Sequence, residues 1–258
     1  MSRRSDSVVA FREPLLVDEF SIRALALLEP EGLDAEGQGW QQRKSVQTRI
    51  VILEAAIDCL QLNGYGHTTT QLIAEMAGIS RGAMLHHYAT KQDLIASVID
   101  YTVYKRWAMF LEGIRALKDP ARIQKMAGIE ISWASMQTSE FAAYLELAIA
   151  ARTDPALAEV FLPKARQLDQ IAMTKVIEAF PEWAHDLEGY KLSMDYATAT
   201  LMGLLINRDT WSEPAQRGVR EFLGKTIAML RRGELIPPAQ AEASAPRAAG
   251  EPLTGPGK

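Results

Sequence analysis

The stretch TTQLIAEMAGISRGAMLHHYATKQDL, residues 69–94, contains two short amphipathic segments separated by a glycine. Thr69 can cap a first helix, and its apolar residues recur at helical spacing: Leu72, Ile73, Met76 and Ala77. Gly78 ends that helix, and Ser80 can cap a second helix over residues 81–88. Two short helices joined by a three-residue turn that contains glycine are typical of a helix-turn-helix motif, here residues 69–88.

The flanking residues predict a further helix on each side of this motif. From Ser45 onward, apolar residues line one helical face until the glycines at 64 and 66 end the pattern. After the motif, Thr90 and Asp93 form a capping box. The helix that follows has an apolar stripe reaching Ile114, which at 1.5 Å per residue spans roughly 36 Å. We expect this long helix to couple the motif to the rest of the chain.

The remaining chain is predicted to be helical as well. Prolines punctuate four or five helices between residues 119 and 232, because proline is tolerated only near helix starts. The last two helices, about 187–210 and 214–232, bracket the small-residue stretch DYATATLMGLL. Such a flat helix face suits either a subunit interface or the ordinary interior of a bundle. Both alternatives stay open on these residues alone.

Charge and cysteine content limit the classes of protein that remain. The 258 residues carry a net charge of -4, yet residues 43–106 hold 7 Lys/Arg and 5 Asp/Glu and are positive. The single cysteine, Cys59, permits no internal disulfide and no cysteine-rich zinc site. No apolar run approaches the roughly 20 residues that a membrane span needs, so we expect a cytoplasmic protein.

The adjacent histidines His86 and His87 suggest three kinds of site. A zinc pair on a helix requires i, i+4 spacing, whereas adjacent side chains diverge by about 100°, so we expect no metal. Ser80 lies at a helix cap rather than in a nucleophile elbow, and no carboxylate is placed to orient either ring, so we expect no catalytic residue and no cofactor. Contact with nucleic acid is the interpretation that uses most of the neighbouring residues.

The second helix of the motif carries residue types that suit a DNA groove. Arg81 can reach base edges or a phosphate, and the small Gly82 and Ala83 let the backbone approach the groove. His86 and His87 can donate to phosphates, as can Thr70, Gln71 and Lys91, while helix N-termini at Thr69 and Thr90 add oriented amides. The alternative is a solvated polar face on a helical hairpin.

A longer stretch, ILEAAIDCLQLNGYGHTTTQLIAEMAGISRGAMLHHYATKQDLIASVI at residues 52–99, resembles the DNA-binding domain of the TetR family of bacterial transcriptional regulators. The matching motifs are ILEAA, NGY, LIAEMAGIS, RGAMLHHY and KQDL, in the family's order and spacing. The resemblance implies phosphate contacts for Thr70, His87 and Lys91, and base or groove contacts for Gln71, Arg81, Ala83 and His86. Leu85 departs from the pattern, since the family usually has tyrosine there.

The resemblance also implies a homodimer joined by the last two helices of each subunit and a ligand cavity in the C-terminal domain. The aromatic and methionine residues on the middle helices would suit an apolar effector in that cavity. They are Trp107, Phe110, Trp133, Met136, Phe141, Tyr144 and Met173. Each of them could equally serve core packing.

We therefore expect an all-α chain of two domains. An N-terminal extension, partly helical and then a linker (1–45), precedes the three-helix DNA-binding domain (46–106). A C-terminal helical domain for effector binding and dimerisation (107–232) and a disordered tail (233–258) follow. The extension is expected to dock onto the protomer or its mate.

The predicted function is regulation of transcription, as a repressor that a small, largely apolar molecule releases from a palindromic operator. An effector-independent architectural DNA-binding protein, a ligand-dependent activator and an enzyme stay open as alternatives. For an enzyme, His185 beside Asp186 is the suggestive pair in the C-terminal domain.

Overall fold

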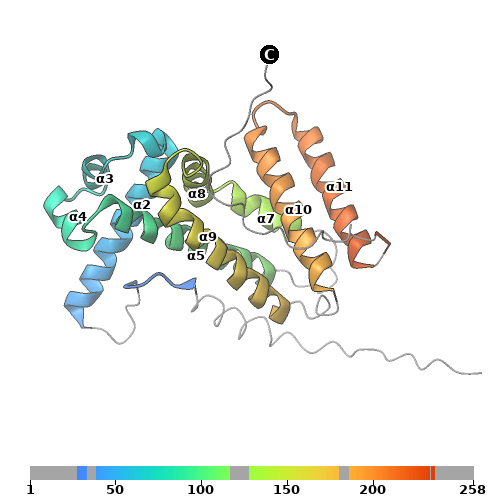
Figure 1. Cartoon of the computed structure of the whole chain (residues 1–258), viewed down its shortest axis with the longest axis horizontal. Helices are drawn as coiled ribbons and strands as arrows, with labels where there is room; N and C mark the ends of the chain where they lie inside the picture. Colours follow the sequence, from blue (N-terminus) through green and yellow to red (C-terminus); the bar gives the residue numbers. More distant parts are fainter. Residues whose placement is uncertain (1–27, 34–38, 117–127, 180–185, 233, 236–258) are drawn as a thin grey trace, which may run out of the picture.

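The computed structural model describes residues 28–33, 39–116, 128–179, 186–232 and 234–235. Within these ranges the fold is all-helical, as predicted, and contains no strand. The helices are α2 (Trp40–His67), α3 (Thr70–Met76), α4 (Arg81–His87), α5 (Lys91–Arg115), α7 (Gly128–Met136), α8 (Ser139–Ala150), α9 (Pro155–Ala179), α10 (Leu187–Ile206) and α11 (Glu213–Arg231). Figure 1 shows α3 and α4 at one end of the molecule and the antiparallel pair α10 and α11 at the other.

The local signals place most helix ends of the N-terminal part correctly. The predicted break at Gly64 is confirmed, since this residue has φ 72° inside the stretch that ends α2. Helix α2 begins at Trp40, earlier than the expected start at Ser45, because the polar residues before Ser45 are compatible with a helix although they carry no apolar stripe. The capping box at α5 is formed: the Thr90 amide donates to Asp93 Oδ2 at 3.0 Å, and the Asp93 amide donates to Thr90 Oγ1 at 3.0 Å.

Two hydrophobic cores hold the helices together. The first encloses α2, α3, α4 and the start of α5, and it also includes Ala143 and Leu147 of α8 and Leu157 and Phe161 of α9. The predicted domain boundary at residue 106 falls inside α5. Because this core includes residues of α8 and α9, it extends past that boundary. The second core joins α7 and α8 to α10 and α11. Helix α8 contributes to both cores and therefore connects the two ends of the molecule.

The short segment 28–33 lies against the first core. Leu28 is buried, and Leu33 packs against the core cluster. A Cβ atom at Gly32 would lie 3.7 Å from the Arg49 guanidinium of α2. This part of the N-terminal extension thus docks onto its own protomer. The expected N-terminal helix before residue 28 and nearly all of the expected disordered tail lie outside the described residues.

Candidate nucleic-acid interface

The turn between α3 and α4 fixes how α4 projects from the molecule. The Thr69 hydroxyl accepts from the Leu72 amide at 3.1 Å, and the Ser80 hydroxyl accepts from the Ala83 amide at 3.1 Å, so both predicted N-caps are present. Gly78 has φ 67°, the left-handed conformation in which glycine ends helices at little cost. Met84 of α4 is fully buried and anchors the helix on the first core.

The opposite face of α4 is open to solvent. Arg81, Gly82, Ala83 and His86 are all exposed, as are Thr69 and Gln71 at the start of α3 and Ser80 at the N-cap of α4. A Cβ atom at Gly82 would meet nothing closer than the Ser80 hydroxyl at 4.0 Å. Seven of the ten predicted DNA-contacting residues are thus exposed on α3, α4 and their caps, and we call this exposed set the α4 face. Thr70, His87 and Lys91 are partly buried at its border.

The two histidine rings differ in their surroundings. Their centroids lie 5.6 Å apart with the planes at 70°, and only His86 is exposed. Burial, followed by the charges of Arg49 and His86, lowers the pKa of His87 below its ordinary value of 6.5. His87 is therefore neutral near pH 7 and can still donate one ring N–H.

Arg49 of α2 is a positive group that the sequence interpretation missed. Its guanidinium lies 5.3 Å from the centroid of the Tyr88 ring, directly after α4. Arg49 and Tyr88 are far apart in sequence, so no local pattern indicates their contact. The position of Arg49 along α2 is the one sequence signal that could have suggested it. Arg49 adds positive charge beside the α4 face.

Lys91, for which the resemblance implies a phosphate contact, lies against the end of α2 in this structure. Its ammonium donates to the Tyr65 carbonyl at 3.3 Å and lies 4.0 Å from the centroid of the Tyr65 ring. Burial lowers the Lys91 pKa, with a smaller opposing effect of Asp154. In this structure Lys91 ties the start of α5 to the end of α2.

The same turn is also tied to the C-terminal helices. The Tyr65 amide donates to Glu146 Oε1 of α8 at 2.8 Å. A Cβ atom at Gly64 would lie only 3.1 Å from that oxygen, so the approach of α8 requires the absence of a side chain here as well as the positive φ. A displacement of α8 would therefore act on the residues that directly precede the motif.

The predicted effector-site residues are divided among several environments. Trp133, Met136 and Phe141 are buried in the second core, and Tyr144 packs against both cores. Trp107 and Phe110 form an edge-to-face pair on α5 with centroids 5.9 Å apart. Met173 belongs to α9, but its side chain is outside the described part of the molecule. These residues are consistent with both core packing and a cavity wall, so their role in binding stays a prediction.

The residue pair considered for an enzyme is only half described. Asp186 caps α10, since its Oδ1 accepts from the Gly189 amide at 2.8 Å, while His185 lies outside the described residues. No helix in the described ranges is long and apolar enough to cross a bilayer.

The capped helices α3 and α4, joined by a short turn on an all-helical frame, form a helix-turn-helix motif. Residues 52–98 match the family model of bacterial regulatory proteins, tetR family. A relative from Mycobacterium tuberculosis (strain ATCC 25618 / H37Rv), an HTH-type transcriptional regulator, is 30% identical over 120 residues, which cover 46% of this chain and 60% of the relative. The match thus spans less than two thirds of that relative's length.

Solved structures share the fold over a longer part of the chain. A TetR family transcription regulator from Marinobacter aquaeolei VT8 aligns with a TM-score of 0.52 at 16% identity, covering 74% of this chain and 97% of that one. The multidrug binding protein EbrR, complexed with imidazole, aligns with a TM-score of 0.51 at 18% identity, covering 74% and 97% respectively. At these identities the similarity establishes the fold, which includes the C-terminal helices.

Proposed function

We propose that this protein is a homodimeric transcriptional repressor that binds a palindromic operator and releases it when a small molecule binds the C-terminal helices. The observation that carries the proposal is the α4 face, because a capped helix anchored by Met84 presents Arg81 and His86 to solvent beside residues small enough to enter a major groove. Such a protein acts in the cytoplasm, at the nucleoid. The relative from Mycobacterium tuberculosis is named a transcriptional regulator, which supports this assignment.

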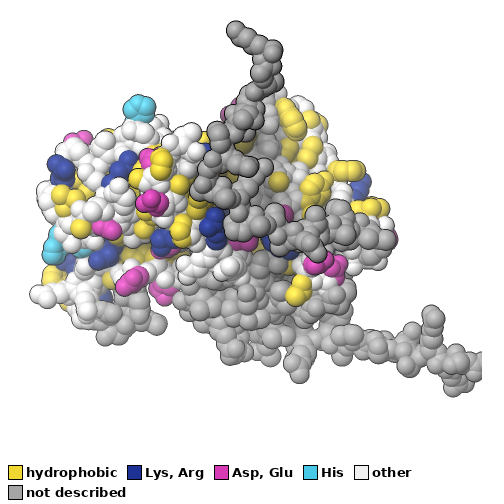
Figure 2. Space-filling view, viewed as in Figure 1, with side chains coloured by type: hydrophobic (Ala, Val, Ile, Leu, Met, Phe, Trp, Pro, Cys, Tyr) yellow, Lys and Arg dark blue, Asp and Glu magenta, His cyan; other side chains and the backbone are white. Residues whose placement is uncertain are grey.

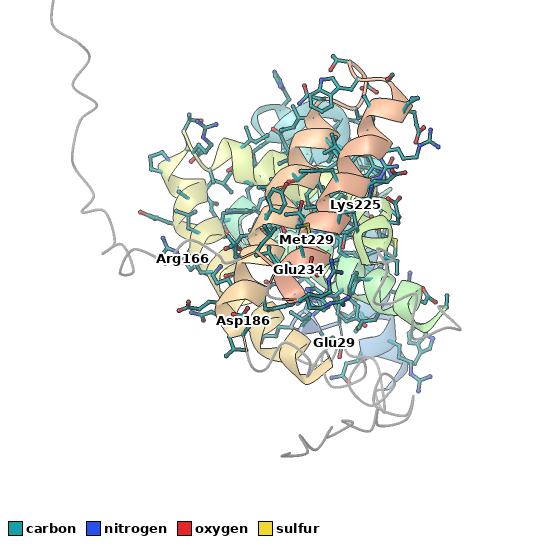
Figure 3. The ribbon with its side chains drawn as sticks, turned by 90° about the vertical axis from the view of Figure 1, so that its right-hand side faces the viewer. Glu29, Arg166, Asp186, Lys225, Met229 and Glu234 are labelled. Atoms are coloured by element: carbon teal, nitrogen blue, oxygen red, sulfur yellow. The ribbon has the colours of Figure 1, made fainter. Side chains whose placement is uncertain are left out.

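The proposed dimer uses the outer faces of α10 and α11. Figure 2 shows hydrophobic side chains gathered at this end of the molecule, and Figure 3 looks onto the two helices, with Lys225 and Met229 on α11. Ile206 is 66% exposed and Phe222 65% exposed, although both are large and apolar. Gly218 lies one turn before Phe222 with open space around it, so a second helix could approach closely. In a two-fold dimer that binds half-sites one turn of DNA apart, the recognition helices of the two subunits must lie about 34–36 Å apart.

The substitution Phe222→Glu tests this dimer. It places a charge in the centre of the proposed interface and should yield monomers in analytical ultracentrifugation. Leu62→Glu is the matched control, because Leu62 is 72% exposed on α2, at a distance from α10 and α11 in the fold. A Phe222→Glu protein that sediments like the wild type excludes the proposed interface.

The proposed release mechanism uses α8. An effector shifts the equilibrium between the DNA-binding and the non-binding conformation only as far as it binds the non-binding conformation more tightly. In that conformation the two recognition helices of the dimer have the wrong separation for the operator. Helix α8 contacts both cores and holds the Tyr65 amide through Glu146, so a shift of α8 reaches the start of the motif directly. EbrR is named a multidrug binding protein, and this supports a small-molecule effector for the shared fold.

Selection of bound fragments from genomic DNA is the experiment that tests the function. The selected fragments should share a palindrome and bind far more tightly than random DNA, with an affinity that falls steeply as salt rises. Arg81→Ala should weaken binding to the selected sequence, while Arg152→Ala, an exposed arginine after α8, should leave it unchanged. Equal affinity for selected and random DNA at every salt concentration would identify an architectural protein instead. Transcription in vitro from a promoter that contains the selected sequence distinguishes repression from activation.

A further inference from the structure

Arg106 of α5 is a partly buried cation whose Nε atom has no hydrogen-bond partner. Its guanidinium carbon lies 4.3 Å from the centroid of the Phe141 ring and 5.6 Å from that of Tyr144, both on the neighbouring helix α8. Its Nε atom is shielded from solvent and donates to no acceptor, and no other buried side-chain nitrogen or oxygen of the described residues is in this position. Buried polar groups are nearly always paired, so this donor calls for an explanation.

The nearby carboxylates do not supply the missing acceptor. Glu140 is paired with Lys105, and Lys105 also donates to Glu54 at 2.9 Å. Burial lowers the Arg106 pKa to about 10, and the more distant charges of Tyr144 and Glu140 only partly oppose this effect. Arg106 thus remains protonated at neutral pH. The aromatic rings stabilise its charge from their faces, but they accept none of its N–H groups in the manner of an oxygen.

Arg106 forms part of the wall of a cleft. The cleft has a volume of about 300 Å³ and lies along α5 at the start of α8. Ala108, Met109 and the ring of Tyr104 provide apolar lining, and Lys105, which is paired with Glu140 and Glu54, also lines the cleft. Two carboxylates also line the cleft, of which Glu140 is neutralised by Lys105 and Glu112 is exposed. Its volume is at the lower end of the range of about 300–1,000 Å³ that is usual for small-molecule pockets.

We propose that Arg106 anchors an anion-binding subsite and that the effector is a small aromatic or apolar molecule with a carboxylate group. The inference deepens the proposed function, since it assigns the chemical class of the effector. A planar guanidinium can donate two parallel hydrogen bonds to a carboxylate, which is the group that best satisfies it. An effector bound there would contact α5 and α8 together, and α8 carries the Glu146 contact to Tyr65.

Paired probes test the proposal on the full-length protein. The carboxylates are benzoate, phenylacetate and 1-naphthoate, and the controls are the corresponding neutral amides, each measured by calorimetry at pH 7.5. The wild type should bind at least one carboxylate at least tenfold more tightly than its amide. Arg106→Gln should remove this preference, whereas Arg166→Gln, an exposed arginine on α9 labelled in Figure 3, should keep it.

A second readout separates ligand binding from a structural role. Removal of the unsatisfied Nε donor of Arg106 should leave the melting temperature of the free protein unchanged or raised, whereas loss of a structural arginine would lower it. Arg106→Leu serves as a second variant if the glutamine protein does not fold. The proposal is overturned if no carboxylate is preferred, if the preference survives both substitutions, or if neither variant folds.

DNA binding and carboxylate binding are measured separately, so failure of the anion subsite can be distinguished from failure of the proposed function. Binding of the selected DNA by the wild type without any carboxylate preference contradicts the anion subsite alone. Carboxylate binding that depends on Arg106 in a protein that does not recognise specific DNA would contradict the repressor and support the subsite.

Discussion

Two leucines of α2 offer a direct test of the first core. Leu60 is 1% exposed and Leu62 is 72% exposed, although they are two residues apart in one helix. Leu60→Ala and Leu62→Ala change helix propensity equally, so the difference between the two variants isolates burial. Leu60→Ala removes three buried carbons, worth about 2–2.5 kcal/mol at about 0.8 kcal/mol each. The cavity left behind brings the expected loss of unfolding free energy to about 2–5 kcal/mol. Leu62→Ala should cost less than about 0.5 kcal/mol.

Urea denaturation followed by circular dichroism measures both variants. The comparison is made at one protein concentration, because dimer formation adds a concentration-dependent contribution to stability. Hydrogen exchange at the amides of α3 and α4 shows whether the loss falls on the helix-turn-helix itself. If the two variants differ by less than about 0.5 kcal/mol, the inferred packing of α2 is wrong.

Three further outcomes follow from single contacts. Ser80→Ala should cost about 1 kcal/mol of unfolding free energy because the Ala83 amide loses its acceptor, while Ser80→Asn should retain the cap; equal stability of the two variants would contradict the cap. The pKa of His87 is lowered in the folded state, so the unfolded chain takes up a proton first as pH falls, and stability is lost below about pH 6.5. His87→Gln should reduce the difference in unfolding free energy between pH 7.5 and pH 5, and an unchanged difference counts against the assigned shift. Glu146→Ala should speed hydrogen exchange at the Tyr65 amide, whereas Glu146→Gln keeps an acceptor oxygen and should change it less.

Structural features that depend on neighbouring residues could be predicted from the sequence. The caps at Thr69 and Ser80, the capping box at Thr90 and the positive φ of Gly78 all depend on residues within a few positions of one another. The apolar spacing likewise predicted that Ile73 faces the core. These features follow from backbone geometry and side-chain reach, which do not depend on the rest of the fold.

The contacts that connect distant helices could not be predicted in this way. Glu146 and Tyr65 are 81 positions apart, and nothing in the spacing around either residue indicates the other. In the sequence Arg106 is an ordinary charged residue between Lys105 and Trp107, and only the fold places Phe141 of α8 against it. Nothing in the spacing around Lys91 indicates its contact with the Tyr65 ring either. Such pairs depend on how the helices pack, which helical periodicity alone leaves undetermined.

Gly64 restricts how this turn can change during evolution. Its backbone conformation excludes other residues, and the carboxylate of Glu146 occupies the space where a side chain would begin. A side chain at position 64 would therefore push α2 and α8 apart. It would weaken the hydrogen bond between the Tyr65 amide and Glu146 even without a ligand. Position 146, in contrast, can exchange glutamate for another acceptor of similar length. We therefore expect position 64 to tolerate almost no substitution, whereas position 146 should tolerate several.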